Sequence, residues 1–139
     1  MPPVVLTIAG SDSSAGAGIQ ADIKAIHAAG CYALTALTAV VAEVPGHVRT
    51  IHNLPASLVE DQIRVCFEFY PIAAVKTGML PTYEIIHTVS KLLNSFRSSG
   101  CVFYLIVDPV MVASAGDKLI SDDAIEAYRT ALLPIADLV

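Results

Sequence analysis

The chain has few charged residues and no cluster of basic ones. Only 15% of its 139 residues are charged, whereas 55% are hydrophobic; soluble proteins usually have about a quarter charged. The formal net charge is -5, and no run of Lys or Arg occurs. Because nucleic acid is bound by clustered Lys and Arg, this composition argues against a nucleic-acid partner. In a chain with so many hydrophobic residues, either helices cover the sheet on both faces or some apolar surface is left for a partner to cover.

Paired cysteines, a secretory signal and a membrane-spanning segment are also lacking. Cys31, Cys66 and Cys101 are far apart and form no C-x-x-C pair, so we expect three buried thiols in a reducing cytoplasm. No basic region precedes the first apolar run, as a secretory signal would require. Residues 25–42 carry no fixed charge, but Gly30 divides them into a helix end, a turn and a buried strand. We therefore expect a cytoplasmic protein without a membrane partner.

Strand-like and helix-like segments alternate along the chain. Apolar runs predict buried strands at 4–10, 33–42, 72–80 and 102–107, and the start of a fifth at 135–139. Helical spacing predicts helices at 18–29, 55–70, 81–96 and 121–133, with a loop at 43–48 and a turn at 116–117. This alternation indicates an α/β fold whose parallel-rich sheet is covered by helices on both faces. The chain stops inside a predicted strand, so we expect the front half of a longer domain.

The segment AGSDSSAGAGIQAD, residues 9–22, is the most informative motif. Its Gly16, Gly18 and Ala21 fit the G-x-G-x-x-G/A pattern of dinucleotide-binding turns. In those turns the strand leads directly into the first glycine, whereas residues 11–15 intervene here, which disfavours that interpretation. A Walker A loop is excluded because no G-K-[S/T] follows the glycines.

Polar residues and glycines follow the predicted strands at 10–12, 43, 76–79 and 108–111. Since ligands of α/β sheets bind at the carboxyl ends of the strands, we expect a small-molecule site there. Lys76 has no evident role and is expected to be either a solvated lysine or a strand-end lysine. The four histidines show no metal-binding spacing and are expected on the surface: His27, His47, His52 and His87.

The motifs resemble those of the bacterial hydroxymethylpyrimidine and phosphomethylpyrimidine kinases of thiamine biosynthesis, which belong to the ribokinase superfamily. The resemblance rests on LTIAGSDSSAGAGIQADIKA (6–25), TALTAVVAE (35–43), VKTGML (75–80) and VDPVMVASAGDKLI (107–120). It implies a ribokinase-like three-layer α/β/α fold in a homodimer. It also implies phosphorylation of 4-amino-5-hydroxymethyl-2-methylpyrimidine and its monophosphate, with ATP and Mg²⁺.

The resemblance further implies that residues 9–22 line the pyrimidine pocket and do not hold ATP phosphates. Small residues suit this role, since Gly10, Gly16 and Gly18 allow close approach to a flat ring and positive φ. The implied substrate-binding residues are Gly10, Ala17, Asp22, Glu43, Met79 and Val110.

Individual roles follow from the same resemblance. Asp22, placed in the first turn of its helix, would accept hydrogen bonds from the substrate's hydroxymethyl group or amine; the alternative is an acid facing the helix dipole. Glu43 stands where the family usually has Gln, and an ionised Glu offers acceptors only. It would accept from the amine of an aminopyrimidine or be protonated when buried; the alternative is a solvated loop acid. Met79 and Val110 would wall the ring. Asp108 would lie near the Mg-nucleotide, because Mg²⁺ favours one or two carboxylates plus phosphate oxygens.

In the family, the catalytic residue and most ATP contacts lie beyond the position that corresponds to residue 139. The resemblance therefore implies that residues 1–139 are the N-terminal, substrate-binding part of one domain and are inactive as a kinase alone. Two alternatives stay open. One is a pyridoxal kinase, which shares the fold and the style of pocket, and the other is a non-catalytic module that binds a small molecule or a protein.

Overall fold

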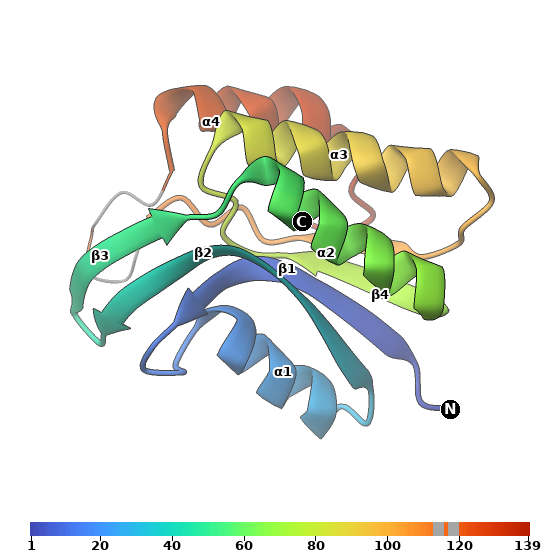
Figure 1. The fold of residues 1–139 in the computed structure, drawn as a ribbon, viewed down its shortest axis with the longest axis horizontal. Coiled ribbons are helices and arrows are strands. Elements are labelled where there is room, and N and C mark those ends of the chain that lie inside the picture. The colour runs from blue at the N-terminus through green and yellow to red at the C-terminus, as the bar shows by residue number, and fades with distance from the viewer. Residues whose placement is uncertain (113–115, 117–119) are drawn as a thin grey trace.

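The computed structural model describes residues 1–112, 116 and 120–139, and Figure 1 shows a sheet between two layers of helices. The strands are β1 (Val4–Asp12), β2 (Tyr32–Val44), β3 (His47–Asn53), β4 (Ile72–Thr77) and β5 (Tyr104–Val107). The α-helices are α1 (Gly18–Ala28), α2 (Ala56–Phe69), α3 (Tyr83–Ser98) and α4 (Asp122–Ala127). A π-helical turn (Tyr128–Leu132) and a 3-10 turn (Leu133–Ile135) continue α4.

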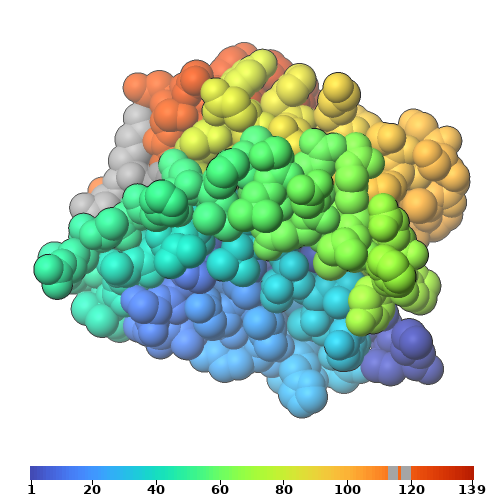
Figure 2. Space-filling view, in the orientation of Figure 1, coloured from blue at the N-terminus to red at the C-terminus, as the bar shows by residue number. Residues whose placement is uncertain are grey.

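The sheet has the strand order β3-β2-β1-β4-β5. β2, β1, β4 and β5 run parallel, and only β3 is antiparallel to its neighbour. Helix α1 lies on one face of the sheet, and α2, α3 and α4 lie on the other. Figure 2 shows the same layers as surfaces, with blue α1 below and the yellow-to-red helices above. The predicted α/β class, with a parallel-rich sheet and helices on both faces, is confirmed.

Strand β1 is central because its sequence is apolar on both sides. Leu6 and Ile8 are fully buried, and Val4 is 2% exposed. The register of β1 against β2 shifts between Ala9 and Ser11, where Gly10 alone lies opposite two residues of β2, Thr38 and Ala39. Such bulges bend a strand and redirect its side chains, frequently beside a functional site. The strand continues past this point to Asp12, two residues beyond its predicted end.

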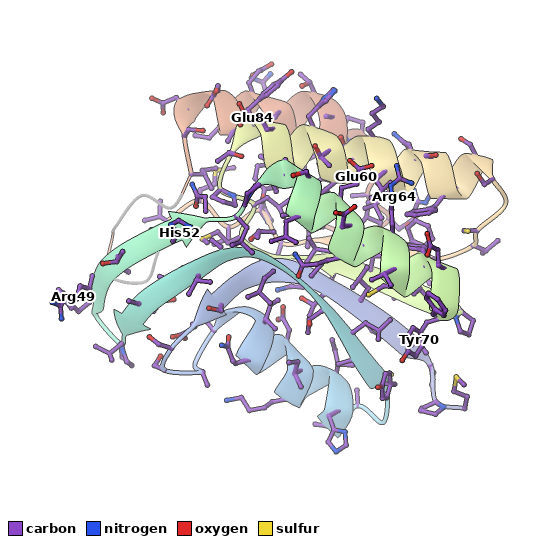
Figure 3. The ribbon with its side chains drawn as sticks, viewed as in Figure 1. Arg49, His52, Glu60, Arg64, Tyr70 and Glu84 are labelled. Atoms are coloured by element: carbon purple, nitrogen blue, oxygen red, sulfur yellow. The ribbon has the colours of Figure 1, made fainter. Side chains whose placement is uncertain are left out.

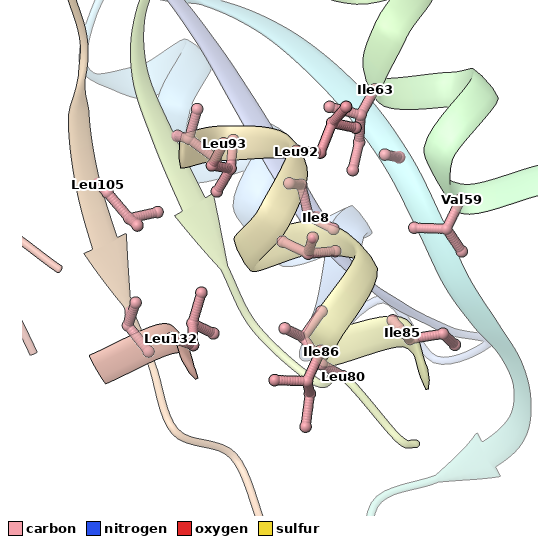
Figure 4. Packing of buried hydrophobic residues seen from close by; sticks show 14 of the residues in the cluster. Ile8, Val59, Ile63, Leu80, Ile85, Ile86, Leu92, Leu93, Leu105 and Leu132 are labelled. Atoms are coloured by element: carbon pink, nitrogen blue, oxygen red, sulfur yellow. The ribbon is translucent and has the colours of Figure 1, made fainter. Parts of the chain in front are cut away.

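The main core fills the space between the sheet and helices α2 to α4 (Figure 4). Ile63 of α2, Ile86 and Leu93 of α3, and Leu105 of β5 are fully buried there. Burying one such side chain stabilises a fold by about 1.5–3 kcal/mol. Helix α3 starts where the Thr82 hydroxyl accepts a hydrogen bond from Ile85 N at 3.2 Å. This packed layer holds the strand ends in place for the site described below.

Several predicted boundaries are wrong. The interval 43–48 is not a loop: β2 continues to Val44, a two-residue turn at 45–46 follows, and β3 begins at His47. Of the fifth strand predicted at 135–139, the structure shows one parallel bridge between Leu138 and Ile106. The predicted helix at 121–133 is present but changes winding at Tyr128.

The turn at 116–117, the cysteines and the histidines can also be compared with their predictions. The turn predicted at 116–117 is only partly accessible, since residue 117 lies outside the described residues. The prediction of three buried thiols is wrong, because Cys101 is exposed and Cys31 and Cys66 are half-buried. All four histidines are exposed, as predicted. Within the described ranges, none of the helices is long and apolar enough to cross a bilayer.

Candidate functional site

A cavity of about 470 Å³ opens at the carboxyl ends of the parallel strands. The structure brings together there all seven residues predicted from the sequence: Gly10, Ala17, Asp22, Glu43, Met79, Asp108 and Val110. They come from β1, its following loop, α1, β2 and the segments that follow β4 and β5. The β2–β3 hairpin also contributes Pro45 to Val48 to the lining. These residues were not predicted as site residues, because the interval 43–48 was expected to be a loop.

The loop between β1 and α1 is shaped by the carboxylate of Asp12. This buried group accepts hydrogen bonds from Ser14 N and Oγ, both at 2.7 Å, from Gly16 N at 2.9 Å and from Ala17 N at 2.8 Å. Burial alone would raise the pKa of Asp12, but these hydrogen bonds outweigh burial and lower the pKa below its usual value. Asp12 therefore fixes the loop that carries Ala17 into the pocket. The sequence signal was Asp followed by two serines, a pattern typical of side-chain-capped turns.

One glycine of the motif is required by its backbone conformation. Gly18 has φ of +59°, and a Cβ there would lie 2.4 Å from Gly10 O. Gly10 and Gly16 do not have positive φ, whereas Ala15 of the same loop does, with φ of 59°. A Cβ on Gly10 would lie 2.7 Å from Met79 Cε. Thus positive φ is found at Gly18 alone of the three, and the close approach of Gly10, Gly16 and Gly18 to a ligand ring stays a prediction.

Asp22 points from α1 toward the sheet and joins a network of polar side chains. It accepts a hydrogen bond of 2.6 Å from Thr7 Oγ1, and Lys76 Nζ lies 3.0 Å from each of its carboxylate oxygens. Lys76 Nζ is also 4.0 Å from Asp108 Oδ2. The prediction that Asp22 lies in the first turn of its helix is wrong: α1 begins at Gly18, and its first turn has no acidic residue. Since the helix dipole acts within the first turn, the alternative of an acid facing that dipole is disfavoured. Lys76 lies at the end of β4, which is one of the two expected alternatives, but it is not a solvated lysine: its side chain is 24% exposed and is held by Asp22.

Glu43 is anchored through its backbone. Its N–H donates to Ser13 Oγ at 2.8 Å, and its carbonyl accepts from the same hydroxyl at 2.5 Å. Its carboxylate has no hydrogen-bond or ion-pair partner among the described residues. Burial raises the pKa of Glu43, and the negative charge of Asp12 raises it further. Glu43 thus presents an unpartnered acid to the cavity.

The apolar wall of the pocket is a small cluster separate from the main core. Met79, 8% exposed, packs there with Ala39, Val41 and Val110. Two buried hydroxyls hold the backbone of Gly78 and Met79. Thr38 Oγ1 donates to Met79 O at 2.7 Å, and Tyr128 OH donates to Gly78 O at 3.1 Å. Each anchor comes from a different side, one from β2 and one from the π-helical turn.

The cavity has little capacity to hold a metal by itself. Among the described residues, no group of three or more His, Cys, Asp or Glu side chains is placed to share an ion. Asp108 lines the cavity with a side chain that is 57% exposed, and its Oδ2 lies 4.0 Å from Lys76 Nζ. Since Mg²⁺ needs only one or two protein carboxylates when phosphates supply other oxygens, Asp108 fits a cation that arrives with a nucleotide.

The fold and the pocket define a ribokinase-like α/β protein, and comparison with solved structures agrees. A phosphomethylpyrimidine kinase from Clostridium difficile superposes with a TM-score of 0.87 at 40% identity, over 96% of this chain and 56% of that one. The pyridoxal kinase from Staphylococcus aureus, solved with pyridoxal, gives a TM-score of 0.82 at 36% identity, over 98% and 48% of the two chains.

The sequence comparisons give the family. The model of the phosphomethylpyrimidine kinase family matches residues 12–139, and the chain belongs to this family. A hydroxymethylpyrimidine/phosphomethylpyrimidine kinase of Streptomyces coelicolor is 44% identical over 97% of the chain and 48% of its own length. A protein named putative hydroxymethylpyrimidine/phosphomethylpyrimidine kinase 2, from Schizosaccharomyces pombe, is 44% identical over 99% of the chain and 24% of its own length. The chain therefore spans half or less of these relatives.

Proposed function

We propose that the complete polypeptide containing these residues transfers a phosphoryl group from ATP to 4-amino-5-hydroxymethyl-2-methylpyrimidine and to its monophosphate. One observation carries the proposal: in a chain of this family, Asp22, Glu43 and Met79 come from three separate elements and line one cavity. A cavity of about 470 Å³ is within the range of small-molecule sites, which are largely apolar with a few placed polar groups.

In this proposal the described residues bind and orient the pyrimidine. Met79 and Val110 contact the ring, while Gly10 and Ala17 let it approach the backbone. Asp22 accepts a hydrogen bond from the hydroxymethyl group, with its carboxylate held by Thr7 and Lys76. Holding the alcohol in one orientation is much of what phosphoryl transfer requires of a protein.

ATP and Mg²⁺ belong to the same proposal. Two comparison structures of the Staphylococcus aureus pyridoxal kinase contain AMP-PCP or ADP, which supports a nucleotide in this fold. When bound, Mg²⁺ neutralises charge on the phosphates, and Asp108 is the described residue that would contact it. We further propose that residues 1–139 form the substrate-binding part of a larger ribokinase-like domain, since the relatives are at least twice as long. A cytoplasmic homodimer stays a prediction.

A pyridoxal kinase is the second candidate, because that enzyme from Staphylococcus aureus shares the fold at 36% identity and was solved with pyridoxal. An ATP-coupled assay of the complete polypeptide decides between them by comparing kcat/KM for the pyrimidine and for pyridoxal. A higher value for the pyrimidine supports the proposal, and turnover of pyridoxal alone overturns it. Absence of turnover with both, but binding of the pyrimidine, would favour a non-catalytic binding module.

Asp22 provides the residue-level test of this function. We expect Asp22→Ala to raise the Kd for the pyrimidine by about 2- to 10-fold, because one hydrogen bond contributes roughly 0.5–1.5 kcal/mol. Asp61→Ala, on the exposed surface of α2, is the control and should leave Kd unchanged. Calorimetric titration measures both. An unchanged Kd in a folded Asp22→Ala protein would remove Asp22 from the binding site.

A further inference from the structure

Among the described residues, four carboxyl groups line the pocket, and three of them are already engaged. Asp12 is bound by the loop amides and by Ser14, Asp22 is bound by Thr7 and Lys76, and Asp108 lies 4.0 Å from Lys76. Only Glu43 has a carboxylate with no hydrogen-bond or ion-pair partner among the lining residues that the structure describes. Its full capacity to accept hydrogen bonds is therefore available to a ligand.

The backbone of Glu43 is also fixed, so that the residue lines the cavity in which a ligand would bind. Ser13 Oγ bonds both its N–H and its carbonyl, so only the side-chain torsions remain free. Charged and titratable groups face the cavity from every element around it: Asp12 of β1, Asp22 of α1, His47 of β3, Lys76 of β4 and Asp108 after β5. The one fixed cation of this set, Lys76, is engaged by Asp22 and Asp108. Among the described lining residues, no further Lys or Arg is present to neutralise Glu43.

The proposed ligand presents an edge that a bare carboxylate matches poorly. An aminopyrimidine has an exocyclic amine, which donates, beside a ring nitrogen, which accepts. A carboxylate offers only acceptors, so one of its oxygens would face the lone pair of the ring nitrogen. A single proton between that oxygen and that nitrogen turns the repulsion into a hydrogen bond. The result is a charge-assisted pair if the proton is on the ring, or a neutral pair if it is on the acid.

We propose that Glu43 binds the aminopyrimidine edge with one shared proton, so that ligand binding takes up one proton from solvent. The inference rests on the proposed pyrimidine substrate and adds the protonation state in which that substrate is bound. The proton balance is simple: free ionised Glu43, neutral pyrimidine and one H⁺ from the buffer give the complex, and no covalent bond to carbon changes. Burial and the charge of Asp12 already raise the pKa of Glu43, which favours uptake.

A definite pH dependence follows. Above the pH at which both free partners have lost the proton, each complex formed must take one from solvent. The affinity then falls about tenfold for each further pH unit, by the linkage between binding and protonation. With Gln at this position, the amide supplies the donor and the acceptor itself. Its complex needs no proton, so its affinity should stay flat over the same range.

The test is calorimetric titration of the complete polypeptide with 4-amino-5-hydroxymethyl-2-methylpyrimidine. Titrations at about pH 8, where a free Glu is ionised, are done in two buffers with different ionisation enthalpies, such as Tris and HEPES. The slope of the observed enthalpy against buffer enthalpy gives the protons taken up. Wild type should take up about one proton and Glu43→Gln none. Glu84→Gln, exposed on α3 (Figure 3), is the matched control and should behave as wild type.

Each outcome decides something. Uptake of one proton that disappears in Glu43→Gln supports the inference. Pyrimidine binding without proton uptake overturns the inference and leaves the proposed function intact. Proton uptake that persists in Glu43→Gln also overturns the inference, because the proton would then be on a group other than Glu43. If wild type shows no binding and no turnover of the pyrimidine, the proposed function itself fails, and this inference fails with it.

Discussion

Lys76 Nζ lies 3.0 Å from both carboxylate oxygens of Asp22 and 4.0 Å from Asp108 Oδ2. One ammonium group thus connects the acid proposed to orient the substrate with the acid proposed to contact the nucleotide's cation. The Asp22 and Lys76 side chains are 17% and 24% exposed, so they are only partly screened by water. We therefore expect Lys76 to position both acids, although nothing in the sequence alone distinguished it from a solvated lysine.

The first prediction concerns this ion pair. Lys76→Met should lower the free energy of unfolding by about 1–3 kcal/mol, because it leaves Asp22 partly buried with Thr7 as its one remaining partner. It should also raise the KM for the pyrimidine more than it lowers kcat. Urea denaturation and steady-state kinetics measure the two effects.

The matched control is Arg64→Met, which removes the ion pair between Arg64 and Glu60 on the surface of α2 (Figure 3). Exposed pairs of this kind contribute about 0–0.5 kcal/mol, so this variant should keep its stability and its KM. Adding Asp22→Asn to Lys76→Met gives a double-mutant cycle. Strictly additive losses of stability would mean that the two residues do not interact in solution.

The second prediction is the pH dependence of the loop held by Asp12. Asp12→Asn should lower the free energy of unfolding by about 1–3 kcal/mol at neutral pH, because in either orientation the amide's NH₂ would face donating backbone N–H groups, that of Ser14 or those of Gly16 and Ala17. The pKa of Asp12 is lowered in the folded protein. Its contribution is therefore fully present above about pH 4 and is lost as pH falls through the folded pKa. The two proteins should thus become equally stable in acid.

Urea denaturation over a series of pH values measures this difference. Asp61→Asn, on the exposed face of α2, serves as the comparison and should track wild type at every pH. A gap between wild type and Asp12→Asn that stays constant down to the acid limit would show that the carboxylate charge is not what holds the loop.

The parallel strands could be predicted because apolar runs are local signals in the sequence. The seven pocket residues were implied by the family resemblance of four motifs, and the fold brings them together. Strand β3 was missed since its apolar members, Val48 and Ile51, are three residues apart and do not alternate. Its position is set by pairing with β2, which is a tertiary contact. The roles of Asp12 and Lys76 were hidden for the same reason. Polar side chains give no periodic signal, and only the fold shows what each one contacts.

The third prediction separates the two costs of replacing a glycine at positive φ. Gly18 and Gly30 have φ of +59° and +76°, but a Cβ at Gly18 would lie 2.4 Å from Gly10 O, whereas Gly30 has no atom within 4 Å. Gly30→Ala should therefore cost only the backbone term, about 1–2 kcal/mol. Gly18→Ala should cost roughly 1–3 kcal/mol more, because the backbone at Gly10 must move.

Chemical denaturation of the two variants gives the comparison, and ligand titration adds a second readout. Gly18→Ala should also weaken pyrimidine binding, since Gly10 lines the pocket, while Gly30→Ala should not. Equal losses of stability in the two variants would mean that the loop relaxes freely around the added methyl group.

The fourth prediction tests whether buried hydroxyls position the apolar wall of the pocket. Thr38→Val removes the hydrogen bond to Met79 O, and Tyr128→Phe removes the one to Gly78 O, each with little change of shape. Both should lower the free energy of unfolding by about 1–3 kcal/mol, because each leaves a carbonyl without its hydroxyl donor. Both should also weaken pyrimidine binding by about 3- to 10-fold, as the released backbone lets Met79 move out of contact with the ring.

Ser90→Ala is the control for the fourth prediction. The Ser90 hydroxyl is likewise buried and donates to a carbonyl, that of His87, but both residues lie within α3 and away from the lining of the pocket. Ser90→Ala should lower the free energy of unfolding without weakening pyrimidine binding. Comparing it with Thr38→Val and Tyr128→Phe therefore separates the effect on stability from the effect on affinity. If Thr38→Val and Tyr128→Phe bind the pyrimidine as tightly as Ser90→Ala does, the wall is positioned by its apolar packing with Ala39 and Val41 and not by the two hydroxyls.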